Sequence, residues 1–209
     1  MIDLYTWSTP NGRKVSIALE ELGLKYRSHS VDIGQNEQFA PDFLAISPNN
    51  KIPVIVDHDC STHLMESGAI LLYLAQKTGQ LISSKPDLYW QTIAWLMWQM
   101  SGQGPMLGQV HHFVKFNPGS SEYAERRYLT EAKRLYSLLN DRLSSREFVA
   151  DDYSIADIAI WPWVARFQWQ TIELNKYPNV KRWYCTIANR PAVQRGYVVP
   201  DKTALIPVP

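Results

Sequence analysis

The fold is decided by residues 47–74, which read S-P-N-N-K-I-P-V-I-V-D-H-D-C-S-T-H-L-M-E-S-G-A-I-L-L-Y-L. The β-branched run at 54–56 predicts a strand, and Pro53 at its entrance removes only a ladder donor that can be spared. The peptide bond before this proline is also a candidate for the cis form. Glu66-Ser67-Gly68 directly precedes an apolar helical run, so Ser67 is expected at the N-cap or in the first turn of a helix.

The same stretch predicts a binding site for a small ligand that carries both charges. Free N–H groups at the start of the helix attract a carboxylate. Glu66, beside them, attracts an ammonium group. Because a backbone edge at Ile52-Pro53 accompanies these two features, the ligand is expected to resemble a peptide.

Composition limits the class of protein. The chain has 209 residues, 45% of them apolar, which allows one large domain or two small ones. With 21 basic and 20 acidic side chains, the net charge of +1 gives no electrostatic reason to expect nucleic acid or an anionic membrane as partner. No apolar run approaches the roughly 20 residues that span a bilayer, no secretory signal is recognisable, and two cysteines make no disulfide framework. We therefore expect a cytoplasmic protein.

Residues 1–80 show alternating strand and helix signals. Their order is β-α-β-α-β-β-α, which predicts a small α/β unit with a mixed sheet. Gly23 and Gly79 are expected to end two of the helices. The strands are predicted at 2–5, 26–33, 52–56 and 63–65, and the helices near 15–22, 39–44 and 67–78.

Strand signals disappear after a linker at 81–88, so residues 89–209 are predicted to form an all-α domain. Its helices are expected at 88–116, 121–143, 154–170 and 180–188, the first of them interrupted at Gly102–Pro105. Ser154 and Asp157 have the spacing of a capping box, for which we expect a structural role. The tail at 198–209 contains three prolines and is expected to be extended or poorly ordered.

Six segments carry a family resemblance. They are T-P-N-G at 9–12, I-S-P-N-N-K-I-P at 46–53, E-S-G-A-I-L-L-Y-L-A at 66–75, G-P-M-L-G-Q at 104–109, H-H-F at 111–113 and Y-S-I-A-D-I-A at 153–159. In this order they resemble the glutathione transferase superfamily, and within it the bacterial Nu class of glutathione-dependent disulfide-bond oxidoreductases. The resemblance covers nearly the whole chain and departs in the loop at 60–63 and in the tail. It implies a thioredoxin-like N-terminal domain, an all-α C-terminal bundle, glutathione as co-substrate, no metal, and a homodimer.

For the reacting sulfur, the resemblance implies that Thr9 and Asn11 hold the glutathione thiolate. The first 59 residues contain no cysteine, which excludes an enzyme-bound mixed disulfide at this turn. T-P-N-G can also be an ordinary turn that starts a helix, with its proline at a favoured early position. Tyr5 and Ser8 are the alternative donors to sulfur.

For the rest of glutathione, the resemblance assigns a set of residues around the opening stretch. The Ile52 backbone would pair with the cysteinyl part, Ser67 would hold the γ-glutamyl carboxylate, and Glu66 would hold the ammonium group. Ordinary roles as helix cap or first-turn acid compete with the last two. The full set is Gln38, Lys51, Ile52, Pro53, Glu66 and Ser67, with Gln38 and Lys51 near the glycyl end.

Two further features lie in the second domain. Arg127, in E-R-R-Y at 125–128, is expected by resemblance to reach a glutathione held by the partner subunit, although Arg126 leaves this uncertain by one position. His111 and His112 point about 100° apart on a helix, so they do not suggest a metal site and are expected to line a crevice.

The sequence thus predicts an enzyme that uses glutathione thiolate to reduce small disulfides, with weak conjugating activity. Two alternatives remain. One is a dedicated transferase that conjugates glutathione to electrophiles, because a fold alone does not separate the two chemistries. The other is a non-enzymatic interaction module, like those in some elongation-factor subunits and in a fungal nitrogen regulator.

Overall fold

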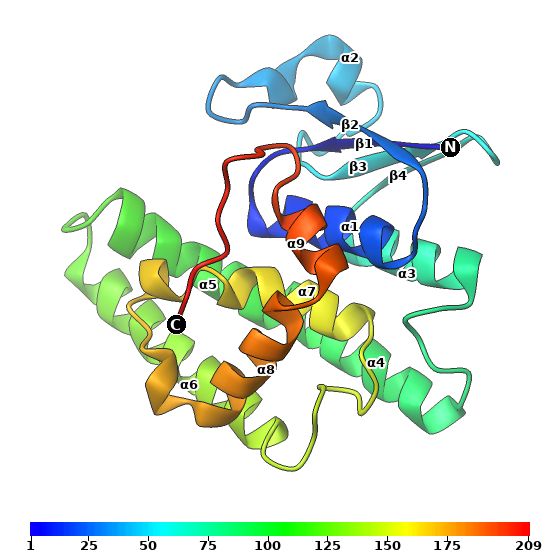
Figure 1. Ribbon diagram of the computed structural model, residues 1–209. Helices are drawn as coiled ribbons and strands as arrows, with labels where there is room; N and C mark the ends of the chain where they lie inside the picture. Colours follow the sequence, from blue (N-terminus) through cyan, green and yellow to red (C-terminus); the bar gives the residue numbers. More distant parts are fainter. The chain divides into compact units, whose positions relative to one another are not determined.

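The computed structural model describes residues 1–209 and divides them into two compact units (Figure 1). The first unit comprises Met1–Gln80 together with Asn189–Ile206, and the second comprises Leu81–Ala188 together with Pro207–Pro209. The segment that follows residue 188 therefore groups mainly with the first unit, whereas the sequence analysis assigned all residues from 89 onward to the helical domain.

The first unit is built on a four-stranded mixed sheet, as predicted. Its strands are β1 (Ile2–Thr6), β2 (Tyr26–Ser30), β3 (Val54–Asp57) and β4 (Thr62–Met65). Their order in the sheet is β2-β1-β3-β4. β1 is parallel to β2 and antiparallel to β3, and β3 is antiparallel to β4.

Three of the four helices of this unit were predicted. They are α1 (Pro10–Glu21), the short α2 (Pro41–Leu44) with a 3₁₀ turn at Glu37–Phe39 before it, and α3 (Ser67–Thr78). Gly23 and Gly79 follow α1 and α3 with φ of +61° and +67°, as expected of residues that end helices.

The two faces of the sheet pack against different helices. Tyr5, Val54 and Met65 are opposite one another in register and pack in one cluster with Phe43 of α2. The next residues along, such as Leu4 and Ile55, point to the other face because side chains alternate along a strand. Figure 1 shows α1 and α3 on the side of the sheet away from α2.

The fourth helix, α9 (Pro191–Tyr197), packs against α1 and was not predicted. Its seven residues are too few to display a helical period. The contact is close: the Ser16 hydroxyl donates to the Gly196 carbonyl at 2.7 Å, and Arg13 Nε donates to the Tyr197 carbonyl at 3.0 Å. α9 therefore completes the core of the first unit from the far end of the chain.

The second unit is all-α, as predicted. Its helices are α4 (Pro86–Trp98), α5 (Gly104–Val110), α6 (Glu122–Arg142), α7 (Ile155–Val164) and α8 (Pro178–Ala188). π-helical segments at Gln99–Gln103 and His111–Phe116 follow α4 and α5, and 3₁₀ turns occupy Phe167–Gln170 and Leu174–Lys176. The predicted interruption near Gly102–Pro105 is thus a π-helical turn, a known way to accommodate a helix irregularity.

The predicted helix at 154–170 is shorter than expected, because α7 ends at Val164. Its start was predicted correctly: Ser154 and Asp157 form a reciprocal capping box. Asp157 is fully buried and also accepts a hydrogen bond from Trp183 Nε1 at 2.8 Å. Burial raises the pKa of Asp157 to about 6, although the hydrogen bonds from Trp183, Val149 and Ser154 oppose that shift.

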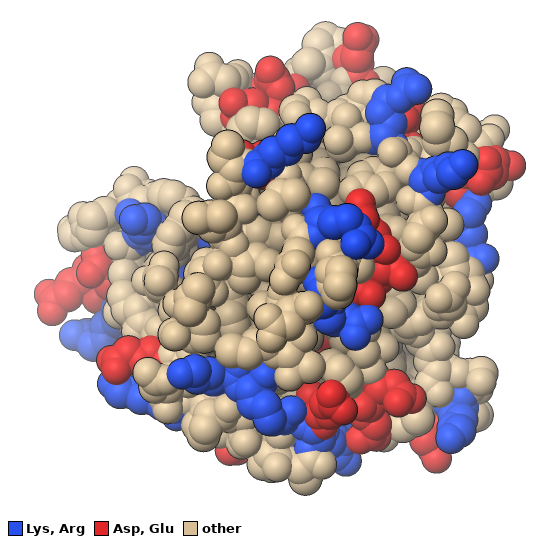
Figure 2. Space-filling model, in the orientation of Figure 1, with Lys and Arg blue, Asp and Glu red and all other residues tan.

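None of the helices combines the length and the apolar character that crossing a membrane requires. Basic and acidic side chains are interspersed over the face seen in Figure 2. The last residues, Val198–Pro209, contain no helix or strand, and the Pro207 carbonyl accepts a 2.7 Å hydrogen bond from the Tyr184 hydroxyl.

Candidate functional site

Three of the predicted segments meet at one edge of the sheet. Tyr5 pairs with Val54, and Val54 pairs with Met65. The exit of β1, the entrance of β3 and the exit of β4 therefore lie side by side. Three segments adjoin these strand ends: the T-P-N-G turn, Ile52-Pro53 and Glu66-Ser67. The register of the sheet therefore brings the three segments together.

The T-P-N-G turn starts α1. Thr9 is the N-cap, and its Oγ1 accepts a hydrogen bond from the Gly12 N–H at 3.1 Å. A side chain at Gly12 would overlap the Trp7 carbonyl, so only glycine fits there. The turn is thus a helix start, and Thr9 can still act on a ligand, because a hydroxyl that accepts one hydrogen bond keeps its own proton to donate. Asn11, the second residue of α1, is partly exposed.

Tyr5, the alternative donor to sulfur, lies in the packing cluster below α2. Its ring stacks on His29 with centroids 4.6 Å apart and contacts Phe43 at 6.4 Å. Strand alternation gives this side chain a structural role, which leaves Thr9 and Asn11 as the better-placed candidates.

The Ile52–Pro53 peptide bond is cis. Pro53 is buried, and Ile52 packs against the cluster around Val54 and Phe43. The preceding loop is held by Ser47, whose hydroxyl donates to the Lys51 carbonyl at 2.9 Å. The Lys51 residue itself is exposed. Main-chain groups at the entrance of β3 are thereby fixed in position.

Glu66 and Ser67 form the start of α3. Glu66 is the N-cap residue, with φ of 68° and ψ of 113°, and it is exposed. A non-glycine residue at positive φ is a strained conformation that often marks a functional site. Ser67, the first residue of the helix, is only 4% exposed. The pair presents a carboxylate, a hydroxyl and the N-terminus of a twelve-residue helix at one point.

Lys14 also belongs to this region and was missed by the sequence analysis. Its Nζ donates to Ser67 Oγ at 3.2 Å, and the residue is 1% exposed. Burial lowers the pKa of Lys14 to about 7, and the charge of Glu66 opposes that shift. Lys14 is three residues after Asn11 and four before Ala18, on the same face of α1, but this spacing does not by itself predict that the lysine is buried.

Gln38 lies in the 3₁₀ turn before α2 and is partly buried. Its Oε1 is shielded from solvent and has no hydrogen-bond partner. An unsatisfied buried amide oxygen is an available acceptor for a ligand donor.

Arg127 lies on α6, in the second unit. Arg126 and Arg127 both line a cavity of about 610 Å³, together with Met106, Tyr123, Tyr128, Thr130 and Glu131. Arg126 forms a 3.9 Å ion pair with Glu122. Hydrogen bonding and charge from Arg134, and the charge of Arg127, lower the pKa of Glu131. The two arginines thus give one open cavity a positive lining, and neither is singled out by its contacts.

Of the two adjacent histidines, His111 has a different role from the one expected, and His112 is exposed. His111 is buried, stacks on Trp163 with centroids 5.6 Å apart, and lies 3.2 Å from Gln170 Nε2. Burial, and secondarily the charge of Arg166, lowers the pKa of His111 to about 4. It is a neutral core residue and does not line a crevice. No group of three or more His, Cys, Asp or Glu side chains is arranged to hold a metal ion.

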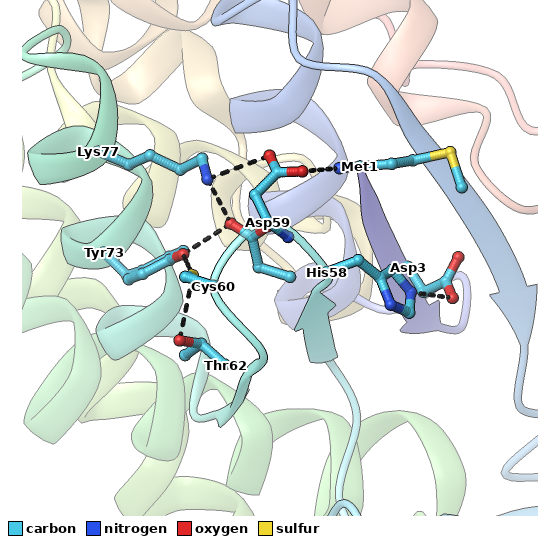
Figure 3. Close-up of polar contacts among 9 residues, drawn as sticks. Met1, Asp3, His58, Asp59, Cys60, Thr62, Tyr73 and Lys77 are labelled. Carbon is cyan, nitrogen blue, oxygen red and sulfur yellow. Dashed lines mark hydrogen bonds and ion pairs between the residues drawn. The ribbon is translucent and has the colours of Figure 1, made fainter.

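Both cysteines are free. Cys60 is exposed in the β3–β4 turn, at the other end of β3 from the T-P-N-G turn, and Figure 3 shows it beside Tyr73 and Thr62. Its Sγ lies 3.2 Å from Thr62 Oγ1 and 3.0 Å from the Tyr73 hydroxyl. These hydrogen bonds lower the pKa of the Cys60 thiol. Cys185 is on α8, in the second unit.

Comparison with known proteins gives consistent matches over both units. Residues 4–81 match the N-terminal domain of glutathione S-transferases, and residues 104–191 match their C-terminal domain. The disulfide-bond oxidoreductase YfcG of Escherichia coli is 52% identical over 198 residues, which covers 92% of each chain. The disulfide-bond oxidoreductase YghU of the same organism is 39% identical, over 95% of this chain and 74% of its own.

A solved structure agrees with these matches. A glutathione transferase from Pseudomonas putida, with one glutathione disulfide bound per subunit, has a TM-score of 0.90 and 43% identity, covering 95% of this chain and 91% of its own. Two domain matches and relatives of this similarity leave one conclusion. The chain belongs to the glutathione S-transferase family.

Proposed function

We propose that this protein is a glutathione-dependent disulfide-bond oxidoreductase that acts in the cytoplasm as a homodimer and uses no cysteine of its own. The observation that carries the proposal is the meeting of the T-P-N-G turn, Ile52-Pro53 and Glu66-Ser67 at one edge of the sheet. The single cysteine of this unit, Cys60, lies at the opposite end of β3.

Glutathione fits this edge by its chemistry. Its γ-glutamyl carboxylate matches the Ser67 hydroxyl and the start of α3, since helix N-termini attract anions. Its ammonium group matches the exposed Glu66 carboxylate. The peptide part would pair with the main chain of Ile52. The peptide bond from Ile52 to Pro53 is cis. Lys51 and the unsatisfied Gln38 Oε1 are available for the glycyl end.

Thr9 and Asn11 would then hold the sulfur. A cysteine-like thiol has an unperturbed pKa of about 8.5, so only a few per cent is thiolate at neutral pH. Donors to sulfur stabilise the thiolate and lower that pKa. The Thr9 hydroxyl accepts from the Gly12 N–H and keeps its own proton to donate to sulfur.

The reaction is two successive thiol–disulfide exchanges. The bound glutathione thiolate attacks one sulfur of a small disulfide R–S–S–R, so that a G–S–S–R bond forms and RS⁻ leaves. A second glutathione thiolate attacks the glutathione sulfur of that mixed disulfide, which yields glutathione disulfide and a second RS⁻. Two electrons pass from two glutathiones to the substrate, and the protons lost by the two glutathione thiols are taken up by the two product thiols.

The relatives support this chemistry. Two E. coli relatives are named disulfide-bond oxidoreductases. A glutathione transferase from Burkholderia graminis, 43% identical with a TM-score of 0.90, holds two glutathione molecules per subunit. Two thiols on one subunit are what a two-step exchange requires. Several solved relatives are named glutathione transferases, which is why we also expect a weaker conjugating activity.

Two steady-state assays with glutathione test the proposal, one with a small mixed disulfide and one with an aryl halide. We expect the disulfide to turn over faster, and a Cys60→Ser, Cys185→Ser double variant to keep the full rate. Faster turnover of the aryl halide would favour a conjugating transferase. If neither substrate reacts and the protein is not retained on immobilised glutathione, an interaction module would be the better description.

Arg127 is proposed to contact the glutathione of the partner subunit. The positive lining of the cavity on α6 supports this role, and Arg126 is the matched control because it lines the same cavity. Light scattering should give the mass of a dimer. Arg127→Ala should raise the KM for glutathione, while Arg126→Ala should leave it unchanged; the reverse pattern would assign the role to Arg126.

A further inference from the structure

We infer that Lys14 is a positioning residue for the γ-glutamyl carboxylate of glutathione: its side-chain amine takes up a proton from solvent when the carboxylate binds, and the resulting ammonium group orients the Ser67 hydroxyl toward that carboxylate. This role depends on the proposed function, because it requires glutathione at Ser67.

The geometry joins two elements of the first unit. Lys14 is on the first turn and a half of α1, and Ser67 opens α3. The 3.2 Å hydrogen bond from Nζ to Oγ crosses between these two packed helices. Both residues are nearly inaccessible, with 1% and 4% exposure. A lysine is seldom buried to this extent unless its charge is paired.

The direction of this hydrogen bond determines what Ser67 can do. An ammonium group has three donors and no acceptor, so the Ser67 oxygen must accept from Lys14. The hydroxyl proton of Ser67 can then be donated only to a group other than Lys14. A ligand carboxylate at the start of α3 is such an acceptor, and it would gain the nearby positive charge as well.

The neighbouring residue Arg13 provides a contrast. It is 2% exposed, but its guanidinium lies 3.7 Å from the centroid of the Tyr197 ring and its Nε donates to the Tyr197 carbonyl. Arg13 therefore ties α1 to α9, which is a structural task. Lys14 instead directs its charge toward the residues proposed to bind the ligand.

Several other charged and titratable groups lie on and around α1. The charge of Glu66 acts on Lys14 and favours its protonated form. The remaining groups make contacts of their own. They lie on α1, on the elements packed against it (β1, α3 and α9), and at Arg190 just before α9. They are Asp3 with His29 and His58, Tyr5 with His29, Arg13 with Tyr197, Glu20 with Tyr26 and Arg195, Glu21 with Arg190, and Tyr73 and Lys77 with Asp57.

The side chain of Lys14 is expected to titrate near neutral pH. Desolvation lowers its pKa to about 7 in the free protein. A bound carboxylate would raise it again, since an opposite charge favours the charged form. Binding above about pH 7 is therefore expected to be accompanied by proton uptake, and the affinity is expected to fall as the pH rises. From a free pKa of about 7, the expected loss between pH 6 and pH 8 is about tenfold.

The test uses the intact protein and S-methylglutathione, whose blocked sulfur cannot titrate. Isothermal titration calorimetry at pH 7.5 in two buffers of different ionisation enthalpy gives the number of protons taken up. We expect the wild type to take up most of one proton, and its Kd to rise about tenfold between pH 6 and pH 8. Binding without proton uptake would overturn the role of Lys14 and leave the proposed function standing. No binding at all would overturn both.

Two variants and a control separate a functional role from a structural one. Lys14→Met should weaken binding at pH 6 by about tenfold or more and abolish both the proton uptake and the pH dependence. Lys14→Arg, which stays charged, should bind at pH 8 as it does at pH 6. Lys25→Met removes an exposed lysine of the same unit and should behave as the wild type. If Lys14→Met still takes up a proton, another group is responsible and the inference is wrong.

Discussion

The Thr9 hydroxyl accepts a hydrogen bond from the Gly12 N–H at 3.1 Å, so the residue proposed to hold the glutathione sulfur also caps α1. One oxygen thus has a structural role and a proposed chemical role. The two roles can be separated, because a cap affects stability while a donor to sulfur affects the pKa of the thiol.

Thr9→Ala is expected to lower both stability and activity. Loss of the cap should cost about 1 kcal/mol. Loss of a hydrogen bond to a charged sulfur should lower kcat/KM for a small disulfide by about tenfold or more. The pH–rate profile should also shift to higher pH, because the thiol pKa rises when a donor is removed. Steady-state kinetics from pH 6 to pH 9 measure this shift.

Two controls accompany this variant. Thr9→Ser keeps the hydroxyl and should keep the rate. Ser121→Ala removes the N-cap of α6, where Ser121 Oγ accepts from the Ala124 N–H at 3.3 Å, and should cost similar stability with no change in rate. If Thr9→Ala loses stability but keeps the wild-type pH–rate profile, Thr9 is only a cap.

The sequence predicted the sheet and most helices because their signals are local. The strand at 54–56 is β-branched, and Gly23 and Gly79 stop helices through their own backbone conformations. α9 was missed because a seven-residue helix is too short to show a helical period. It is also stabilised by a contact with α1, 180 residues earlier in the chain. Long-range packing of this kind leaves no trace in a local pattern.

The candidate site was predicted to a similar extent. Thr9, Ile52 and Ser67 were identified through motifs, and the sheet register then explains why they meet. Lys14 was not identified, since a lysine in a helix ordinarily reaches solvent and only the packing of α3 on α1 makes it buried. His111 was misassigned for the same reason: burial among Trp163, Trp169 and Gln170 is a tertiary property.

Glu66→Gln is expected to weaken glutathione binding through the ligand's ammonium group. Glu66 is exposed, so the loss should be modest, about three- to tenfold in KM. An analogue of glutathione that lacks the α-amino group should bind the variant and the wild type equally. Comparing the two ligands on the two proteins isolates this one contact.

Glu173→Gln is the control for charge, because Glu173 is an exposed acid of the second unit paired with Lys176 at 2.8 Å. It should leave the KM unchanged. Equal weakening of both ligands by Glu66→Gln would mean that the substitution disturbs the start of α3 and that Glu66 does not recognise the ammonium group.

Asp57→Asn is expected to remove part of the acid sensitivity of the fold. The Asp57 side chain is inaccessible and accepts from the Tyr73 hydroxyl at 2.6 Å and from Lys77 at 2.7 Å. Burial alone would raise the pKa of Asp57, but the hydrogen bonds from Lys77 and Tyr73 prevail and lower it to about 2. The pKa of Asp57 is thus lower in the folded chain than in the unfolded chain. Its carboxylate therefore contributes stability that is fully present above about pH 4 and is lost as the pH falls through about 2.

Urea denaturation at pH 7 and pH 3 measures this contribution. Asp57→Asn should be less stable than the wild type at pH 7 by about 1–3 kcal/mol, and the gap should narrow at pH 3. Asp59→Asn alters the neighbouring exposed contacts with Met1 and Lys77, visible in Figure 3, and should leave stability nearly unchanged at both pH values. A gap for Asp57→Asn that is the same at both pH values would show that its carboxylate does not titrate in this range.

Gly196→Ala is expected to separate α9 from α1. A Cβ at Gly196 would lie 2.6 Å from Ile17 Cα and 2.7 Å from its N, and backbone atoms cannot rotate away as a side chain can. Overpacking of this kind typically costs about 1–3 kcal/mol. The two hydrogen bonds from Ser16 and Arg13 to α9 would weaken with it. Hydrogen exchange at residues 191–197 and urea denaturation measure both effects.

Gly102→Ala is the control, because nothing lies within 4 Å of a Cβ placed there, and it should leave stability unchanged or raised. Since α1 begins with the T-P-N-G turn, a Gly196→Ala variant that exchanges faster at 191–197 but keeps its activity would show that α9 stabilises the unit without ordering the candidate site.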